Sequence, residues 1–554
     1  MSLAKEKISM MLAAAVERAQ RDSILPQVPL PEYIIEKPQN SSHGDYACSL
    51  PLKLARVARM NPLQIAERLV SMMPTTQEIE SVAAVAPGFL NFTLSGQWLQ
   101  KRVPLILESG NRFGDVDIGK AQKVQIEFVS VNPTGPMHVG HGRGGVIGSS
   151  LANVLSAAGY NVQKEYYVND AGNQIDLFNR SLFARYKQAL GLDEPMPPDG
   201  YMGEYMKDLG KKFAEEFGDK FEKLPAPEGQ KQLGSVGQER MISWIKDDLG
   251  QARVSYDNWF HESALYKNDS YRKVMTVLKE QDYVTEKDGA QWFASTSLGE
   301  DKDNVLVRST GAPTYFASDV AYHYNKFVER GFERVIDIWG ADHRGHISRM
   351  KAATSAMGVD PNRLEILIYQ LVTLKRGDEV VRVSKRTGNI ITLREVIDEV
   401  GVDAVRFFFL QRSADSQMEF DLELAKKQSQ ENPVYYIQYA HARIVSILRS
   451  AKEKDITWAG GDVAMLTDKA ELAFIRKMIQ LEEVIETAAL AMEPHHLPHY
   501  AMDLANAFTQ FYEHCRVLTP DFELTAARLK LVEAGRIALS RTLTLMGMST
   551  PEKM

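Results

Sequence analysis

The sequence predicts an α/β protein with a Rossmann-type parallel sheet at its centre, a small α+β domain before it and an all-α bundle after it. Three observations lead to this class. The β-prone run Val124–Val131 leads through glycines and small residues into the helix-like segment Leu151–Ala158. Strand, glycine-rich turn and helix in this order open a nucleotide-binding unit. Helical and strand-like segments alternate before residue 95, and residues from about 411 onward are helical in pattern with few glycines.

Length and composition bound the class of protein. A chain of 554 residues is long enough for about three or four domains. Hydrophobic residues make up 44% and charged residues 25%, which excludes a disordered chain. Two cysteines are too few for a disulfide framework or a four-cysteine zinc site, and they indicate a reduced, cytoplasmic compartment. The net charge of −7 argues against indiscriminate nucleic-acid binding but allows local basic faces.

The first domain is expected at residues 1–112. Ile8–Arg21 has a helical pattern, and its early charged residues Glu17 and Arg18 favour a helix over a secretory signal. A helix pair restarted at a proline and a half-buried strand are expected at Leu52–Ala58, Pro62–Ser71 and Phe89–Leu94. No run approaches the roughly 20 apolar residues that span a bilayer, so we expect no membrane contact.

The central domain is expected at residues 113–410 and the helical domain at 411–554. Charged helical stretches broken by prolines indicate an insertion in the sheet at about 170–303. Further strand signals of the central domain occur at Val162–Val168, Val305–Val307, Val335–Trp339 and Leu364–Leu371.

The strongest chemical signal follows the strand expected at Val124–Val131. His138 and His141 flank Val-Gly before the small-residue stretch. The N-terminus of a helix offers N–H groups and a positive dipole end to phosphate, and Gly140 and Gly142 allow a close backbone approach. The two imidazoles could donate to phosphate oxygens that gain charge in a transition state. The alternative is a glycine turn with incidental histidines.

A second signal lies far downstream at residues 382–389, which read Arg-Val-Ser-Lys-Arg-Thr-Gly-Asn. Lys385, beside Ser384, is the expected point charge on ATP phosphates. A basic surface loop is the alternative for this segment alone. Both segments in this order favour a nucleotide-binding site.

A third set of residues suits a guanidinium ligand. Tyr315 and Asp319 are four residues apart and share a face if their segment is helical. A guanidinium prefers a carboxylate and a further acceptor, which these side chains supply. Asp319 as a helix cap and Glu127 as a surface strand residue are the alternatives when each is taken singly.

These residues resemble those of one family. His138–His141 is similar to the HIGH signature of class I aminoacyl-tRNA synthetases, and residues 382–388 resemble their KMSKS loop, with Arg382 and Val383 in place of the first Lys and the Met. The patterns Glu-Phe-x-Ser-x-Asn and Tyr-x-x-x-Asp of arginyl-tRNA synthetases are matched by Glu127, Phe128, Ser130, Asn132, Tyr315 and Asp319.

The resemblance implies a ligase that activates L-arginine with ATP and transfers it to the 3′-terminal adenosine of tRNA(Arg), with tRNA needed for activation. ATP with Mg²⁺ would be a substrate, without a protein-bound metal or organic cofactor. Its implied contacts are His138, Gly140, His141, Ser384 and Lys385, of which His138, His141 and Lys385 are catalytic. The implied arginine contacts are Glu127, Ser130, Val131, Asn132, His141, Tyr315, Asp319 and His343, the last where many members have Gln.

The resemblance also implies how the end domains meet tRNA. Residues 42–47 look like the family's N-terminal extension, which contacts the outer corner of tRNA, and residues 432–443 resemble the first helix of the anticodon-binding bundle. Tyr435, Tyr436 and Tyr439 could stack on bases and Arg443 could meet phosphates. Core positions at helical spacing are the alternative for the tyrosines. We expect a cytoplasmic monomer.

Two histidine-containing segments allow a metal interpretation. Asp342, His343 and His346 have suitable side chains, but no matched further ligand is visible. The tract at residues 493–499 is interpreted as a solvated loop between helices. Two rival functions are another nucleotidyltransferase that acts without RNA and a non-catalytic RNA-binding relative.

Overall fold

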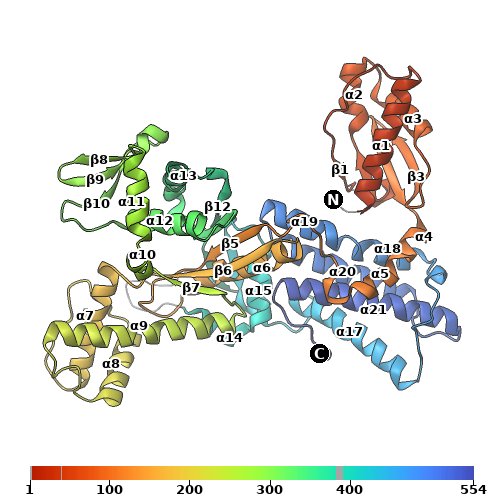
Figure 1. Ribbon diagram of the computed structural model, residues 1–554. Coiled ribbons are helices and arrows are strands. Elements are labelled where there is room, and N and C mark those ends of the chain that lie inside the picture. The colour runs from red at the N-terminus through yellow and green to blue at the C-terminus, as the bar shows by residue number, and fades with distance from the viewer. Residues whose placement is uncertain (1–2, 39, 382–390) are drawn as a thin grey trace.

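The computed structural model describes residues 3–38, 40–381 and 391–554. Ser384 and Lys385 therefore lie outside the described residues. Figure 1 shows an elongated molecule in which a parallel sheet lies between a helical bundle and two lobes. The expected α/β class with an N-terminal α+β domain and an all-α C-terminal part is confirmed.

The N-terminal domain packs three helices on a four-stranded antiparallel sheet of order β1-β2-β4-β3. The expected helix pair is present, and Asn61 caps the second helix by accepting from the Leu63 amide at 2.9 Å. The elements are α1 (Leu3–Arg21), β1 (Ile35–Glu36), β2 (Tyr46–Cys48), α2 (Leu50–Ala58), α3 (Pro62–Met72), β3 (Ile79–Val85) and β4 (Phe89–Leu94).

The central sheet has five parallel strands in the order β12-β11-β5-β6-β7. Its strands are β5 (Lys123–Phe128), β6 (Asn161–Val168), β7 (Asn258–His261), β11 (Arg334–Gly340) and β12 (Leu364–Tyr369). Five of the six residues of β5 are buried, as expected for a strand covered on both faces. The strand ends at Phe128 rather than at the expected Val131, because Val129 and Ser130 turn to φ of 72° and 43°.

The helix α6 (Val139–Ala157) follows β5 and packs on this sheet. It includes the whole small-residue stretch, and so begins earlier than the helix-like segment expected at Leu151. The small residues allow close contact with the sheet: a Cβ atom on Gly148 would lie 2.2 Å from the Phe128 ring. A side chain there would push the helix off the strand that carries the candidate site.

The insertion expected at about 170–303 is divided in two by the edge strand β7, which joins the central sheet beside β6. The first part is a helical lobe with its own core of aromatic and aliphatic side chains. The second is an αβ lobe, and Val305–Val307 belongs to its antiparallel sheet rather than to the central one. The lobes consist of α7 (Asn173–Ala189), α8 (Glu204–Phe217) and α9 (Ala226–Gln251), then α10 (Ser263–Lys267), α11 (Ser270–Glu280), β8 (Val284–Lys287), β9 (Ala290–Phe293) and β10 (Asn304–Val307).

The rest of the central domain continues through α12 (Tyr315–Tyr324) and α13 (Ile347–Ala356) to a three-stranded sheet of order β14-β13-β15. These later elements are β13 (Val372–Arg376), β14 (Glu379–Val380), α14 (Leu393–Val400), α15 (Val402–Leu410), β15 (Met418–Asp421) and α16 (Leu422–Lys426). The bundle is formed by α17 (Pro433–Glu453), α18 (Lys469–Met478), α19 (Leu481–Ala491), α20 (His496–His514) and α21 (Phe522–Leu545).

The bundle is joined to the sheet through the fully buried Arg406 of α15. Its guanidinium donates to the Met546 carbonyl at 2.5 Å, the Ala252 carbonyl at 2.7 Å and Ser149 Oγ at 2.8 Å. One side chain thus ties the end of α21, the end of α9 and α6 together. Because all three partners are needed to satisfy a buried charge, this junction holds the bundle in one position on α6.

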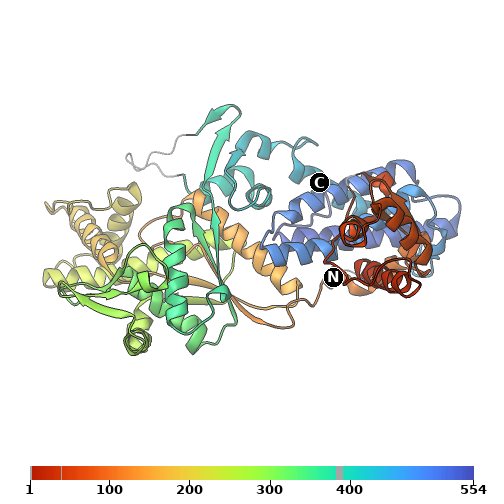
Figure 2. The ribbon, with the colours of Figure 1, turned by 90° about the horizontal axis from the view of Figure 1, so that it is seen from above.

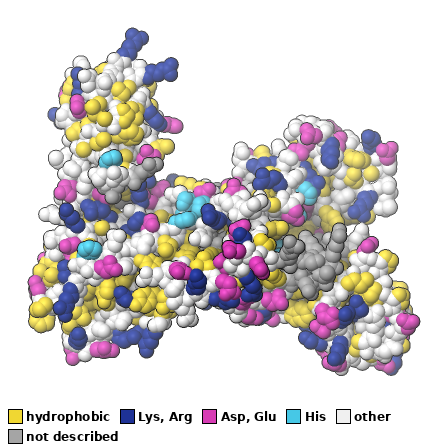
Figure 3. All heavy atoms as spheres, turned by 180° about the vertical axis from the view of Figure 1, so that it is seen from behind, with side chains coloured by type: hydrophobic (Ala, Val, Ile, Leu, Met, Phe, Trp, Pro, Cys, Tyr) yellow, Lys and Arg dark blue, Asp and Glu magenta, His cyan; other side chains and the backbone are white. Residues whose placement is uncertain are grey.

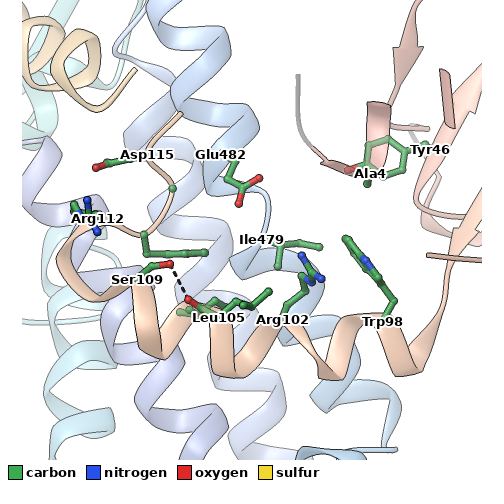
Figure 4. A pocket seen from close by; sticks show the side chains of 13 residues that line it. Ala4, Tyr46, Trp98, Arg102, Leu105, Ser109, Arg112, Asp115, Ile479 and Glu482 are labelled. Carbon is green, nitrogen blue, oxygen red and sulfur yellow. Dashed lines mark hydrogen bonds between the residues drawn. The ribbon is translucent and has the colours of Figure 1, made fainter. Parts of the chain in front are cut away.

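The N-terminal domain stands on the bundle (Figure 2). Residues 95–112, expected in that domain, run as α4 (Gly96–Gln100) and α5 (Arg102–Ser109), and α5 packs along α21. The interface between the N-terminal domain and the bundle, here called the seam, is polar. Glu483 of α19 accepts a hydrogen bond from Tyr46 Oη at 2.5 Å and lies 3.3 Å from Lys37 Nζ. Figure 4 shows a small pocket at this seam, with Trp98 and Arg102 on the linking helices and Glu482 on the bundle.

The face in Figure 3 carries basic and acidic side chains interspersed over all parts of the molecule. Among the described residues, every helix is too short or too polar to cross a bilayer.

Candidate active site

One pocket of about 820 Å³ opens at the carboxyl ends of the central strands. Parallel strands bring the residues that follow them to one edge, which is where open α/β sheets bind ligands. The pocket gathers the expected arginine contacts Glu127, Ser130, Val131, Asn132, His141, Tyr315, Asp319 and His343. Residues from four separate segments thus meet in one place, as the sequence analysis requires.

His138 is the N-cap of α6, and its Nδ1 accepts from the Gly140 amide at 2.9 Å. With Nδ1 as acceptor, the neutral ring carries its proton on Nε2 and can donate it to a ligand. The His138 and His141 rings lie 6.0 Å apart, and His141 lines the pocket. The two imidazoles therefore flank the start of α6, beside the pocket.

The first amides of α6 are already occupied, which limits the expected use of this helix end for phosphate. Val139 N donates to the Ile391 carbonyl at 3.1 Å, and His141 N donates to the His138 carbonyl at 3.0 Å. Gly140 instead contributes space: a Cβ atom there would lie 3.0 Å from His138 Nδ1. The Val139 and His141 amides are therefore not free to bind phosphate.

Directly after the 382–389 segment, the chain lies against the start of α6. Ile391 accepts from Val139 N, and Leu393 N donates to the Met137 carbonyl at 2.9 Å. Before the segment, Val381 N donates to Leu374 O at 2.9 Å in the β13–β14 hairpin. The residues that follow the second sequence motif, Ile391 and Leu393, are therefore bonded to the first motif and its neighbour Met137.

The strand end after β5 is shaped by a left-handed turn at Val129 and Ser130. Positive φ is unfavourable for a β-branched residue such as Val129 and marks a position held by its surroundings. Ser130 Oγ donates to Glu127 Oε1 at 2.9 Å and accepts from the Tyr167 amide at 3.1 Å. Tyr166 Oη donates to the Val131 carbonyl at 2.8 Å. This bonding fixes the backbone on which Asn132 stands.

A buried ion network lies beneath the pocket. Lys326 is fully buried and donates to Glu127 Oε2 at 2.6 Å and Asp337 Oδ1 at 2.8 Å. His323 Nε2 lies 2.8 Å from Asp337 Oδ2. Burial works to raise the pKa of Asp337, but Lys326 and His323 outweigh it and lower that pKa to about 2. Both Glu127 oxygens are engaged, so Glu127 supports the pocket floor rather than offering a free carboxylate.

Replacing Lys326 by Met is expected to destabilise the fold by about 4 kcal/mol, because two buried carboxylates lose their cation. A fall in the thermal midpoint should accompany a rise in KM for the pocket's ligand. The matched control is Lys273→Met, which removes an exposed pair with Glu329 at 2.7 Å and should change the midpoint little. Equal midpoints for the two variants would contradict the role of the network.

Asp319 is the free carboxylate of the pocket. It lies on α12 with Tyr315, so the expected helical pairing of these residues is confirmed. Within residues 3–38, 40–381 and 391–554, its carboxylate makes no hydrogen bond or ion pair. Burial raises the pKa of Asp319 to about 7, and Glu127 and Glu262 add to the rise, while His323 and Arg349 oppose it. Arg349 lines the same pocket but forms no ion pair with Asp319 among the described residues, so a ligand can supply a directly bonded cation.

Glu262 is a residue that sequence reasoning missed. It is buried, its pKa is raised by burial, and Ser318 and Tyr167 hydrogen-bond to it and partly oppose the rise. It lies close enough to raise the pKa of Asp319. A second carboxylate near the first favours a delocalised cation with several N–H donors. Its position after an edge strand of mixed residues gives no sequence signal.

The helical lobe also contributes to the pocket, through residues that the sequence analysis did not single out. Tyr205 Oη donates to the Thr134 carbonyl at 2.7 Å, and Gln174 Oε1 accepts from Asn132 Nδ2. Tyr201 and Tyr205 line the pocket. The lobe thus holds the loop that connects β5 to His138.

His343 stands at the rim with its side chain 54% exposed, 3.6 Å from Asp342. It can reach a ligand in the pocket but is not held by a short bond. Among the described residues, Asp342, His343 and His346 do not bring three donor atoms within 4.8 Å of one another.

Comparison with known proteins identifies the family. The model of the class I tRNA synthetase (R) catalytic domain matches residues 102–419. The arginyl tRNA synthetase N terminal domain matches residues 4–94, and the DALR anticodon binding domain matches 437–554. An arginine–tRNA ligase of Dehalococcoides mccartyi is 56% identical over 98% of this chain and 98% of its own.

The chain belongs to the arginyl-tRNA synthetases.

Other relatives agree. An arginine–tRNA ligase of Carboxydothermus hydrogenoformans is 49% identical over 94% of each chain. The solved arginyl-tRNA synthetase of Thermus thermophilus covers 98% of this chain and 99% of its own with a TM-score of 0.76, and at 21% identity it supports the fold. As a member of this family the chain is an arginine–tRNA ligase with a class I synthetase catalytic domain. The rivals, a nucleotidyltransferase without RNA and a non-catalytic relative, are excluded.

The bundle of the synthetase carries a basic groove of about 980 Å³. Arg443 lies over the rings of Tyr439 and Tyr512, at 4.8 and 5.1 Å from their centroids. Tyr435 stacks on Tyr439 at 6.0 Å. The other basic residues that line the groove are Arg449, Lys454, Arg516 and Lys553.

Tyr436 differs from its neighbours. Its ring packs against the core, and its hydroxyl donates to Thr509 Oγ1 at 3.1 Å. Of the four expected tRNA contacts, the structure places Tyr439 and Arg443 in the groove and directs Tyr436 inward.

Proposed function

We propose that the pocket binds arginine with its guanidinium between Asp319, Tyr315 and the nearby Glu262. The pKa of about 7 for Asp319 in a half-buried site supports this placement, because a bound guanidinium supplies the missing countercharge. Ser130, Val131, Asn132, His141 and His343 then face the α-amino and carboxylate end. Glu127 acts through Ser130 and Lys326 and positions this end.

ATP binds as its Mg²⁺ complex at the start of α6. The arginine carboxylate attacks the α-phosphate, and the bond to pyrophosphate breaks. His138 and His141 donate to the phosphate oxygens on which charge develops, and Gly140 leaves room for the nucleotide. Lys385 neutralises charge on the departing pyrophosphate and Ser384 contacts ATP beside it, roles that rest on the sequence motif and on the position of Ile391 beside Val139.

In the second step the 2′-hydroxyl of the terminal adenosine attacks the adenylate carbonyl, and AMP leaves. We propose that residues 1–112 contact the outer corner of tRNA, that 113–410 catalyse and that 411–554 bind the anticodon. The grouping of Tyr439, Arg443 and Tyr512 in one basic groove supports the last role. We also propose a cytoplasmic monomer with no resident metal in the active site.

Discrimination between arginine and citrulline tests the arginine orientation. Citrulline replaces a guanidinium nitrogen by oxygen and has no charge. The synthetase should prefer arginine at least about 1,000-fold in kcat/KM, because citrulline leaves two carboxylates near each other without a cation. Asp319→Asn should shrink this preference. An unchanged preference in the variant would contradict the placement of the guanidinium.

Replacing Arg443 by Ala is expected to raise KM for tRNA about tenfold, since one stacking and charge contact is worth about 1–3 kcal/mol. Aminoacylation at saturating tRNA should keep its kcat. Lys469→Ala, an exposed change on α18 outside the groove, is the control. Equal KM values for the two variants would place the anticodon elsewhere on the bundle.

A further inference from the structure

The turn between α19 and α20 carries four side chains that can ligate a metal ion, Glu493, His495, His496 and His499. Three of the twelve histidines of the chain lie in these five residues, 495–499. From its sequence alone, this tract is expected to be a solvated loop between helices. In the structure α20 begins at His496, so His499 stands on its first turn, and Glu493, His495 and His496 are half-buried.

The donor atoms are already close together. One donor atom from each of Glu493, His495 and His496 lies within 4.8 Å of the others, and no further set of three such residues does so among those described. His496 Nε2 lies 3.0 Å from Glu493 Oε2. The His495 ring stacks on His496 at 4.5 Å and meets the edge of His499 at 6.2 Å. Small side-chain rotations would bring these atoms onto one ion.

His495 has an unused donor atom. Its Nδ1 is buried and has no hydrogen-bond partner within the described part of the chain. The neutral imidazole with a free lone pair is the form that ligates a metal.

We propose that Glu493, His495 and His496 form a Zn²⁺ site that His499 completes. Two or three imidazoles with one carboxylate form a donor set that zinc accepts in tetrahedral geometry. His499 follows His496 by three residues and His495 by four, so it lies on the same face of α20. This site lies outside the active-site pocket, and the proposal does not depend on the roles proposed for the pocket residues.

The location gives the site a structural effect. The α19 helix, which ends just before Glu493, packs against α6. Asp415 lies close enough to His495 to interact with it electrostatically. It belongs to a loop in which the Ser413 and Ser416 carbonyls accept hydrogen bonds from Arg143 of α6 at 2.8 and 2.9 Å. Zinc at this turn therefore fixes the start of α20 beside the junction between the bundle and the central domain.

Titration of the full-length protein with Zn²⁺ after chelator treatment tests the proposal. We expect one Zn²⁺ per chain with a Kd in the micromolar range or tighter, and a rise of the thermal midpoint with zinc through mass action. His495→Ala, His496→Ala and Glu493→Gln should each weaken binding at least about tenfold and reduce the zinc-dependent shift. His514→Ala, at the far end of α20, is the matched control and should bind Zn²⁺ and shift its thermal midpoint with zinc as the wild type does.

Two further readouts separate ligand loss from misfolding. Circular dichroism and aminoacylation by the metal-free variants should match the metal-free wild type, because none of these residues lies in the catalytic pocket. Co²⁺ in place of Zn²⁺ should give the strong visible absorption of a tetrahedral complex in the wild type and the control only. Absence of Zn²⁺ binding by the wild type, or equal binding by all three ligand variants, would overturn the proposal.

Discussion

Replacing Asp319 by Asn is expected to lower kcat/KM for arginine about 1,000-fold in tRNA-dependent ATP–pyrophosphate exchange. The Asp319 side chain makes no ion pair or hydrogen bond within the described residues, and Arg349 of the same pocket acts on it only from a distance, so a bound guanidinium would be its direct partner. Losing one member of a partly buried charge pair costs about 4 kcal/mol, which corresponds to this factor. KM for ATP should change little, because ATP is placed at the start of α6 rather than on α12.

The same carboxylate should give the wild type a pH dependence. The pKa of Asp319 is raised to about 7 in the unliganded protein, so below this pH the carboxyl is protonated and a guanidinium gains no countercharge. kcat/KM for arginine reports groups of the free enzyme and should therefore fall as pH drops below about 7. The Asn variant should lose this acid limb.

Asp342→Asn is the matched control, because Asp342 lines the same pocket with its side chain 80% exposed. It should keep kcat/KM within about threefold, as expected for an exposed charge at a rim. Equal losses in the two variants would mean that total charge, rather than the position of Asp319, governs arginine binding.

Replacing His141 by Ala should lower kcat of the exchange reaction about 100- to 1,000-fold, with a smaller change in KM for arginine. A donor that acts on charge developing in the transition state contributes this much. His138→Asn should cause a similar loss while keeping α6 capped, because Asn is a favourable N-cap and can accept from the Gly140 amide. The measurement is single-turnover formation of arginyl-adenylate with tRNA present.

Thermal melting separates these losses from unfolding. Both histidine variants should melt close to the wild type. A kcat within threefold of the wild type for His141→Ala and His138→Asn would contradict the assignment of both imidazoles as transition-state donors.

The sequence predicts the parts of the site that follow local rules. Tyr315 and Asp319 share a helical face because four residues make about one turn, and α12 has this geometry. His138 caps a helix directly after β5, as the strand–glycine–helix pattern indicates. Both depend on neighbours in sequence.

The residues that the sequence did not reveal act across long separations. Glu262 reaches the pocket only because β7 joins the sheet within the expected insertion. Lys326 pairs with Glu127, which is 199 positions away, and nothing in its local pattern marks it as buried. Tyr436 and Tyr439 are the same residue type on one helix. Only the packing of α20 beside α17 distinguishes the ring that packs on the core from the ring that lines the groove.

The most direct measurement is ATP–pyrophosphate exchange with each of the twenty amino acids, with and without total tRNA. Arginine alone should support exchange, the exchange should depend on tRNA, and Asp319→Asn should lose it. Exchange with another amino acid at a comparable rate, or exchange with arginine that survives in Asp319→Asn, would contradict the claim that this acidic pocket selects arginine.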